Sequence, residues 1–364
     1  MKKSALLMAG ACLITVALSG CGSSSGKSND TAPSTNGTEA RKQEQSVNNG
    51  NSDTTNEFPT SDLSGIVPWK AGGGTDNAMR PLASLAGDNL NQSIVINNMA
   101  GASGATGMAF VNDQASDGYT LLMTAEAPCL YDAMDTGDVT FADFEQVLLV
   151  GEEKVTVVVK ADSKYQTFTD LIDAALAAPG TITLPVSGPA AMGNIVGSMM
   201  YAVTGATFAN TPSEGDADAF AQLLGGQVDC VIGKASTIKS YYENGDIRIL
   251  AVINDERVDM FPDAPAVTEE YPDFDKCLPF SSFYSVSVKK DTPQEVVDVL
   301  KDAFMAAYHT NEYQDFLANA NILPLGYVGE EADNYINAWR KGVISAMHTA
   351  GAIEKSPAEL GLEE

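Results

Sequence analysis

Short apolar runs of strand length alternate with segments of helical periodicity along most of the chain. Strands are predicted at residues 66–67, 94–96, 119–123, 147–150, 155–159, 181–186, 228–232, 247–253 and 285–288. Helices are predicted at residues 171–178, 194–203, 217–224, 294–308, 312–319 and 332–347. This alternation is typical of α/β architecture with mostly parallel sheets, followed here by C-terminal helices.

Three loops rich in Gly, Ala and Ser follow predicted strands, at residues 71–76, 101–107 and 187–194. In open α/β sheets, ligands bind outside the carboxyl ends of the strands. Two of these loops precede residue 158 and one follows it, which predicts a ligand gripped between two lobes.

The first loop carries three successive glycines, Gly72, Gly73 and Gly74, before a helical pattern. Such a turn lets backbone N–H groups converge on a small anion, a carboxylate or a phosphate. The alternative is a tight turn that only starts the helix. A Val at Gly73 is expected to abolish binding, because it fills the anion pocket and disfavours a positive φ. Asp76 is expected to cap the helix instead of facing an anion.

The first twenty residues have the pattern of an export signal. Lys2 and Lys3 precede an apolar run at residues 5–18, which is short for a membrane span. The Leu-Ser-Gly-Cys sequence that ends at Cys21 matches a bacterial lipobox. Cleavage before Cys21 would leave its thiol for a lipid that anchors the protein. The alternative is an ordinary signal peptide with an incidental Cys.

Residues 21–57 are expected to be the lipidated Cys and a disordered tether. Ser, Asn, Thr, Gly and Asp dominate this stretch, and such a composition cannot bury enough surface to offset its conformational entropy. A flexible coil of this length spans about 30–36 Å. The rest of the chain is long enough for two lobes. We expect lobe 1 at residues 58–158, completed by 285–364, and lobe 2 at 159–284.

The formal net charge of −27 argues against nucleic acid and anionic lipid surfaces as partners. The chain holds two His, His309 and His348, and both are expected at surface or packing positions. It lacks the Gly-Lys-Ser/Thr ending of a nucleotide P-loop, the spaced glycines of a dinucleotide fingerprint and a Gly-x-Ser-x-Gly elbow. We therefore predict no cofactor, no metal site and no catalytic residues.

Three Cys lie beyond the N-terminal segment: Cys129, Cys230 and Cys277. At most one disulfide can form among them, and their spacing is not that of metal ligands. Three buried, unpaired residues are the favoured interpretation, and a disulfide stays open.

A string of short motifs resembles the extracytoplasmic solute receptors of tripartite tricarboxylate transporters, the Bug family. The motifs occupy Pro68 with 72–76, Asn98 with 101–104, 117–122, 223–229, 250–252, Arg257 and 261–267, within a resemblance that spans roughly residues 60–345. The resemblance implies a two-lobed fold like that of type II periplasmic binding proteins, with crossing strands and closure on ligand like a flytrap. It also implies small carboxylates as ligands: tricarboxylates, dicarboxylates, acidic amino acids or nicotinate.

In the family, backbone amides and ordered waters of the glycine-rich loop grip a ligand carboxylate. By resemblance, this role falls on Gly72, Gly73, Gly74, Thr75 and Asp76. The second loop contributes Ala102, Ser103, Gly104 and Thr106, and the loop of the second lobe contributes Ser187, Gly188, Pro189, Ala190 and Ala191. The hydroxyls of Ser103 and Thr106 are either ligand donors or plain helix-start groups.

Other candidate ligand contacts carry an alternative structural interpretation. Trp69 either stacks on a ligand or packs in the core. Lys234 either faces a ligand carboxylate or, as favoured, water. Asn194 stands where the family often has His. Glu126 stands where the family often has small or hydroxyl residues; a solvated loop carboxylate is favoured, but in the cleft it would suit a ligand with a cationic group.

The sequence thus predicts a lipid-anchored receptor that binds a small carboxylate between two lobes and delivers it to a tripartite transporter. The partners expected are that ligand and the membrane subunits, with the lipid as the only membrane contact and a monomeric receptor. We expect an extracytoplasmic location at the cell membrane, or in the periplasm if the host has two membranes. The alternatives are a ligand-sensing co-receptor for a membrane sensor kinase and a secreted α/β hydrolase or transferase.

Overall fold

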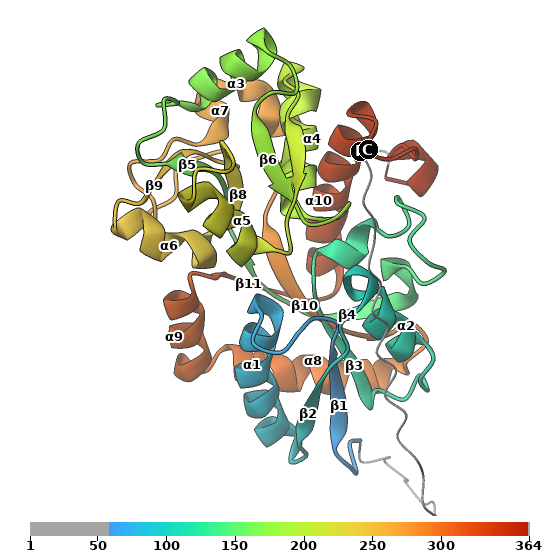
Figure 1. The fold of residues 1–364 in the computed structure, drawn as a ribbon. Coiled ribbons are helices and arrows are strands. Elements are labelled where there is room, and N and C mark those ends of the chain that lie inside the picture. Colours follow the sequence, from blue (N-terminus) through green and yellow to red (C-terminus); the bar gives the residue numbers. More distant parts are fainter. Residues whose placement is uncertain (1–57, 363–364) are drawn as a thin grey trace, which may run out of the picture. The chain divides into compact units, whose positions relative to one another are not determined.

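The computed structural model describes residues 58–362, and Figure 1 shows their helices and strands. The predicted signal peptide, the lipid site at Cys21 and the tether lie outside the described residues. Within the described part of the chain, no helix is both long and apolar enough to cross a membrane.

The first lobe is built on a six-stranded sheet in the order β11-β4-β10-β3-β1-β2. Its strands are β1 (Leu63–Val67), β2 (Ile94–Asn98), β3 (Thr120–Ala125), β4 (Phe144–Glu153), β10 (Ser282–Lys289) and β11 (Leu323–Tyr327). Its helices are α1 (Gly74–Leu90), α2 (Ala105–Asn112), α8 (Gln294–Tyr308) and α9 (Asn311–Ala320). Side chains of β1 alternate between two faces: Leu63 and Val67 pack in the cluster with α1 and α8, and Ile66 packs in the cluster with α2.

The second lobe contains a three-stranded sheet in the order β8-β5-β9 and a separate pair, β6 with β7. Its strands are β5 (Val155–Lys160), β6 (Thr183–Val186), β7 (Ala209–Pro212), β8 (Val231–Lys234) and β9 (Ile247–Val252). Its helices are α3 (Phe168–Ala177), α4 (Met192–Thr204), α5 (Asp216–Leu224), α6 (Ala235–Glu243) and α7 (Val267–Glu270).

The two-lobed α/β fold is confirmed, but the sheets are mixed and not mostly parallel. Among the described strands, β1 pairs in parallel with β2 and β3, and β6 pairs in parallel with β7. The pairings of β4, β5 and β10 are antiparallel. A parallel pair needs a crossover connection, whereas β4 continues into β5 through the single residue Lys154. Strands that cross between lobes therefore break the βαβ alternation.

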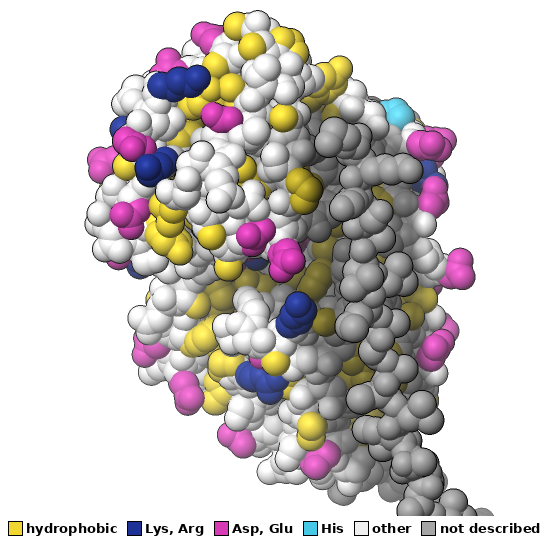
Figure 2. Space-filling view, in the orientation of Figure 1, with side chains coloured by type: hydrophobic (Ala, Val, Ile, Leu, Met, Phe, Trp, Pro, Cys, Tyr) yellow, Lys and Arg dark blue, Asp and Glu magenta, His cyan; other side chains and the backbone are white. Residues whose placement is uncertain are grey.

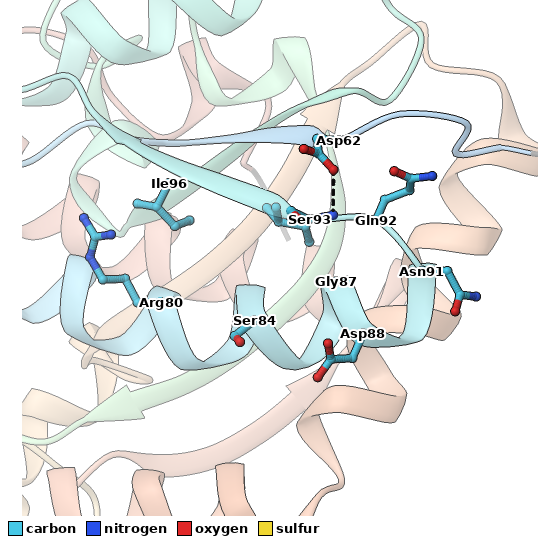
Figure 3. A pocket seen from close by; sticks show the side chains of 10 residues that line it. Asp62, Arg80, Ser84, Gly87, Asp88, Asn91, Gln92, Ser93 and Ile96 are labelled. Carbon is cyan, nitrogen blue, oxygen red and sulfur yellow. Dashed lines mark hydrogen bonds between the residues drawn. The ribbon is translucent and has the colours of Figure 1, made fainter.

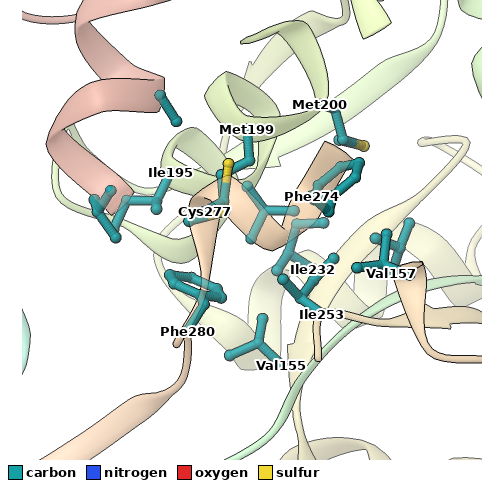
Figure 4. Packing of buried hydrophobic residues seen from close by; sticks show 14 of the residues in the cluster. Val155, Val157, Ile195, Met199, Met200, Ile232, Ile253, Phe274, Cys277 and Phe280 are labelled. Atoms are coloured by element: carbon teal, nitrogen blue, oxygen red, sulfur yellow. The ribbon is translucent and has the colours of Figure 1, made fainter. Parts of the chain in front are cut away.

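The chain passes from the six-stranded sheet to the three-stranded sheet at Lys154, and it returns to the six-stranded sheet at Ser282. The lobe boundaries expected at residues 158 and 284 stay predictions. The C-terminal helix α10 (Gly329–Thr349) contacts α4 of the second lobe as well as β4 of the first. Its Trp339 is fully buried in the same cluster as the side chains of Figure 4, which include Val155 and Phe280. The segment after residue 285 thus joins both lobes.

Cys129, Cys230 and Cys277 are buried and unpaired, which confirms the favoured prediction. Burial raises the pKa of each thiol, to about 11 for Cys277, which keeps these groups protonated near neutral pH. His309 and His348 are exposed, as expected.

Helix ends differ in detail from the prediction. The helix predicted at residues 171–178 begins earlier, because Thr167 is the N-cap residue of α3. The Thr167 hydroxyl accepts from Asp170 N–H at 3.0 Å, and the Asp170 carboxylate accepts from Thr167 N–H at 3.1 Å. The hydroxyl and amide of Thr169 donate to Glu270.

Candidate functional site

A cavity of about 950 Å³ lies between loops of the two lobes. Its volume is at the upper end of the range for small-molecule pockets. All three small-residue loops predicted from the sequence contribute to its wall. The predicted ligand contacts that line it are Trp69, Gly72, Gly73, Gly74, Thr75, Ser103, Gly104, Glu126, Ser187, Ala190, Ala191 and Lys234.

Six other predicted contacts do not line this cavity: Asp76, Ala102, Thr106, Gly188, Pro189 and Asn194. Ala102 and Thr106 are exposed. The Asn194 amide donates to the Pro189 carbonyl at 2.8 Å, so it closes its own loop. Asn194 borders a different surface groove of about 380 Å³.

Sequence reasoning missed several residues of the wall, most of them in or next to α5 and α6. The missed residues include Lys70, Gly101, Met192, Glu214, Gly215, Asp216, Phe220, Thr237, Ser240 and Tyr241. Gly215, two residues before the predicted helix at 217–224, was a usable signal, because a glycine at a helix start lets a ligand approach the backbone closely. The helix α6 was not predicted, since Ala235 and Ile238 are its only buried residues.

The glycine-rich loop ends in the first turn of α1. Gly72 has φ +78°, whereas Gly73 has φ −77° and is the N-cap residue, so the expected positive φ belongs to Gly72. The first intrahelical bond runs from Asn77 N–H to Gly73 O at 2.9 Å. The amides of Gly74, Thr75 and Asp76 therefore have no acceptor within the helix, and a helix N-terminus of this kind favours an anion.

Asp76 holds this loop in place from behind and is 2% exposed. Its carboxylate accepts from Gly72 N–H at 2.8 Å, from Arg80 Nε at 2.9 Å and from Asn98 Nδ2 at 2.8 Å. The expected capping role is wrong in its detail, because Asp76 binds the amide before the N-cap while Gly73 caps the helix. Burial opposes ionisation, but the bonds from Arg80, Gly72 and Asn98 outweigh it and lower the pKa of Asp76 to about 2.

Replacing Asp76 with Asn is expected to lower the free energy of unfolding at pH 7 by about 2 kcal/mol. The folded pKa of about 2 lies below the ordinary value of 3.8, so the ionised carboxylate stabilises the fold above pH 3.8. This stabilisation is lost as the pH falls from 3.8 through 2. Urea unfolding of both proteins at several pH values should show the difference shrinking over that interval. A constant difference would contradict the assignment.

The second loop of the first lobe is a short 3₁₀ turn, η1 (Ala102–Gly104). Ala102 and Ser103 have φ of +46° and +54°, and Gly104 has φ +103°. Left-handed residues other than glycine each cost about 1–3 kcal/mol, so the surroundings must hold them. The Tyr131 hydroxyl does so by donating to the Ser103 carbonyl. A Cβ on Gly104 would lie 3.3 Å from the Trp69 ring, so Trp69 packs against this loop. Trp69 also lines the cavity.

The second lobe presents three helix starts to the same cavity. The N-cap residues are Ala191 for α4, Gly215 for α5 and Lys234 for α6, and all three line the wall. At the start of α6, the amides of Ala235 and Ser236 already donate to the Lys154 carbonyl and to Glu153. First-turn amides of α4 and α5 add to those of α1, so helix N-termini of both lobes converge on one space. Partial positive charges placed in this way can bind an anion without the help of a cationic side chain.

The favoured interpretation of Glu126 as a solvated loop carboxylate is wrong, whereas Lys234 is half-buried in the cavity wall and its contact with a ligand or with water stays a prediction. The Lys234 side chain is 24% exposed, and its Nζ lies 3.3 Å from Asp216 Oδ2. Burial alone would lower the pKa of Lys234, but the carboxylates of Asp216, Glu153 and Glu126 raise it. Glu126 is 8% exposed and accepts from the Ser282 hydroxyl at 2.9 Å. Burial raises the pKa of Glu126. Figure 2 shows acidic and basic side chains near the hollow of this face.

A chain of contacts on the crossing strands joins the two halves of the site. A Cβ on Gly74 would lie 2.9 Å from the Tyr284 hydroxyl oxygen. The Tyr284 hydroxyl donates to Glu153, and the other Glu153 oxygen accepts from Ser236 N–H of α6 at 2.9 Å. Glu153 is 1% exposed, so these bonds satisfy a buried carboxylate. The first turn of α1 is thereby connected to the start of α6.

Another groove, of about 570 Å³, runs along α1 and β2 on the outer side of the first lobe (Figure 3). Arg80, Asp88 and Ile96 lie along it, and Asp62 accepts from Ser93 N–H at 3.0 Å. None of the residues that line it belongs to the three small-residue loops. The cavity between the lobes, where those loops meet, is therefore the candidate ligand site.

A two-lobed α/β fold with such a cavity is that of the periplasmic solute-binding proteins. Residues 78–339 match the model of the tripartite tricarboxylate transporter family receptor, so the chain belongs to this family. This match confirms the family assignment that the sequence motifs predicted.

Relatives and solved structures agree with this assignment. The chain is 28% identical over 273 residues to a protein of the TAR-I ttuE-ttuC' intergenic region of Agrobacterium vitis, covering 74% of this chain and 77% of that protein. It is 26% identical over 297 residues to Protein BugT of Bordetella pertussis, covering 78% of this chain and 90% of that protein. The structure of a TctC solute binding protein from Polaromonas superposes on this chain with a TM-score of 0.66 at 26% identity. The match covers 81% of this chain and 98% of the Polaromonas protein.

Two further structures show the fold together with a bound acid. An R. palustris protein solved with adipate has a TM-score of 0.70 at 24% identity, covering 81% of this chain and 98% of its own. A Rhodopseudomonas palustris protein named MatC, with bound malate, has a TM-score of 0.65 at 21% identity, covering 84% and 100%.

Proposed function

We propose that this protein captures a small carboxylate in the cavity between its lobes and delivers it to the membrane subunits of a tripartite transporter. The observation that carries the proposal is the convergence of the N-termini of α1, α4 and α5 on one cavity. Adipate and malate, the acids bound to the two R. palustris proteins, support the ligand class.

Main-chain donors are the proposed grip on the acid group. The amides of Gly74 and Thr75 face it from the first lobe, and those of Met192 and Ala217 face it from the second. A ligand that bonds to both sets holds the lobes together. Removal of water on closure strengthens each bond, because the local dielectric constant falls.

A net charge of −27 repels a free anion at long range. At physiological ionic strength the Debye length is about 8 Å, so exposed charges beyond that distance are largely screened. Several charge-assisted hydrogen bonds inside the cavity, each contributing about 1.5–3 kcal/mol, outweigh the remaining repulsion. The proposal is therefore compatible with an acidic surface.

The same proposal includes the location of the receptor. We place it outside the cytoplasmic membrane as a monomer, held there by a lipid on Cys21 and a tether at residues 22–57, with no catalytic turnover of its ligand. Incorporation of a labelled fatty acid into the wild type, but not into a Cys21→Ala variant, is expected. An unlabelled wild type would contradict the anchor and leave the ligand proposal intact.

Isothermal titration of residues 58–364 against a panel of carboxylates tests the ligand proposal. At least one acid among citrate, C4 and C5 dicarboxylates, acidic amino acids and aromatic acids is expected to bind at one site per chain. The bound acid should be recovered unchanged after prolonged incubation. If none of the acids in the panel bound measurably, that result would count against a carboxylate receptor. Conversion of the bound acid would point to an enzyme.

A further inference from the structure

Glu126 places a buried carboxylate in the wall of the cavity, where a receptor for plain anions would be expected to avoid one. It follows β3, and it lines the cavity while being 8% exposed. Oε2 accepts from the Ser282 hydroxyl at 2.9 Å. Among the described residues, no other side chain donates to this carboxylate. The Glu126 backbone N–H also bonds to the carboxylate, so two donors from the protein serve a group that lies in the cavity wall.

The positive charge that acts on Glu126, that of Lys234, is shared with the carboxylates of Asp216 and Glu153. The charged side chains in the wall are Lys70, Glu126, Glu214, Asp216 and Lys234, a formal balance of −1. Lys234 is ion-paired with Asp216 at 3.3 Å, and Lys70 is exposed. The helix N-termini carry partial charges that suit the acid group of a ligand, and they do not neutralise a carboxylate elsewhere in the wall.

We infer that Glu126 forms a subsite for a cationic group, so that the ligand is an amino-carboxylate whose ammonium faces Glu126 while its acid group meets the helix N-termini. The inference rests on the proposed function and narrows it. A buried carboxylate is costly unless it is paired, and a ligand ammonium supplies both an opposite charge and further hydrogen-bond donors. A second ligand carboxylate in the same place would face like charge instead.

Matched acids that differ only by the ammonium group test this inference by titration at pH 7.5. The pairs are aspartate with succinate, glutamate with glutarate, alanine with propionate, and phenylalanine with 3-phenylpropionate. In every pair that binds, the amino acid is expected to bind at least tenfold more tightly, which corresponds to 1.4 kcal/mol. In a Glu126→Gln variant, this preference should fall below threefold.

Glu243→Gln is the matched control, because Glu243 is an exposed carboxylate at the end of α6 and does not line the cavity. It should keep the full preference. Equal or tighter binding of the acid without the ammonium overturns the inference while the receptor function stands. Unchanged preference in Glu126→Gln also overturns it. If the wild type shows no measurable binding of any pair, the inference is overturned, and the wider carboxylate panel then tests the receptor function separately.

One other arrangement predicts the opposite result. A protonated Glu126 would donate to a ligand carboxylate, and succinate would then bind more tightly at pH 5.5 than at pH 7.5. Besides burial and Ser282, the titratable groups that act on Glu126 are Lys234, Glu153, Tyr284, Tyr131 and Cys129. Such a gain for succinate, absent from Glu126→Gln, would overturn the cationic subsite in favour of an acid-to-acid hydrogen bond.

Discussion

Replacing Gly74 with Val is expected to weaken binding of the captured carboxylate by a hundredfold or more, about 2.7 kcal/mol. A Cβ at this position would lie 2.9 Å from the Tyr284 hydroxyl oxygen. Tyr284 is 2% exposed and donates to Glu153, so it cannot move aside freely. The first turn of α1 must shift instead, and its free amides lose their alignment with the acid group. Titration with whichever acid binds the wild type measures the loss.

Ser84→Val is the matched control, because Ser84 lies on the exposed side of the same helix, away from the cavity. It should leave affinity within about threefold of the wild type. A double variant, Gly74→Ala with Tyr284→Phe, removes the oxygen that causes the overlap and should bind more tightly than Gly74→Ala alone. Wild-type affinity in a folded Gly74→Val protein would mean that α1 does not hold the ligand.

Replacing Trp339 with Ala is expected to lower the free energy of unfolding by about 3–5 kcal/mol, the range for large buried aromatic side chains. Trp339 is 0% exposed. Its ring stacks on Phe280 at 6.1 Å between centroids and meets the edge of Phe283 at 5.5 Å. Its Nε1–H donates to the Ser281 carbonyl at 2.9 Å. The loss would loosen α10 from the segment that leads into β10.

Urea unfolding followed by circular dichroism measures this effect. Trp339→Phe keeps a ring in the cluster and loses the bond to Ser281, so it should cost less than the Ala variant. The Phe variant should retain ligand affinity, because Trp339 does not line the cavity. A loss below 1 kcal/mol for Trp339→Ala would show that α10 is not held by this cluster.

Local patterns predicted much of the fold, since they depend on neighbouring residues. The helix α8 has the predicted bounds of 294–308, because its apolar face follows a clear helical period. The loop at Gly72 was predictable because a left-handed turn before a helix favours glycine. Strand β7 and helix α6 were missed, because both are short and largely polar on the outside.

The charged part of the site was not predictable in this way. Sequence reasoning gave Glu126 and Lys234 to solvent, because a charged side chain next to a loop is usually exposed. Their burial comes from segments far away in the chain. Ser282 contacts Glu126 across 156 positions, and Asp216, which pairs with Lys234, lies at the start of α5.

The sequence by itself determined the family, many of the strands and helices, and the three small-residue loops. Each of these depends on residue types at short separations, which pattern and backbone preference fix locally. The tertiary structure alone decided the antiparallel crossing strands, the place of α10 on both lobes and the pairing of charges in the cavity. Those features depend on which distant segments exclude water from one another, and a buried carboxylate such as Glu126 acquires its character only there.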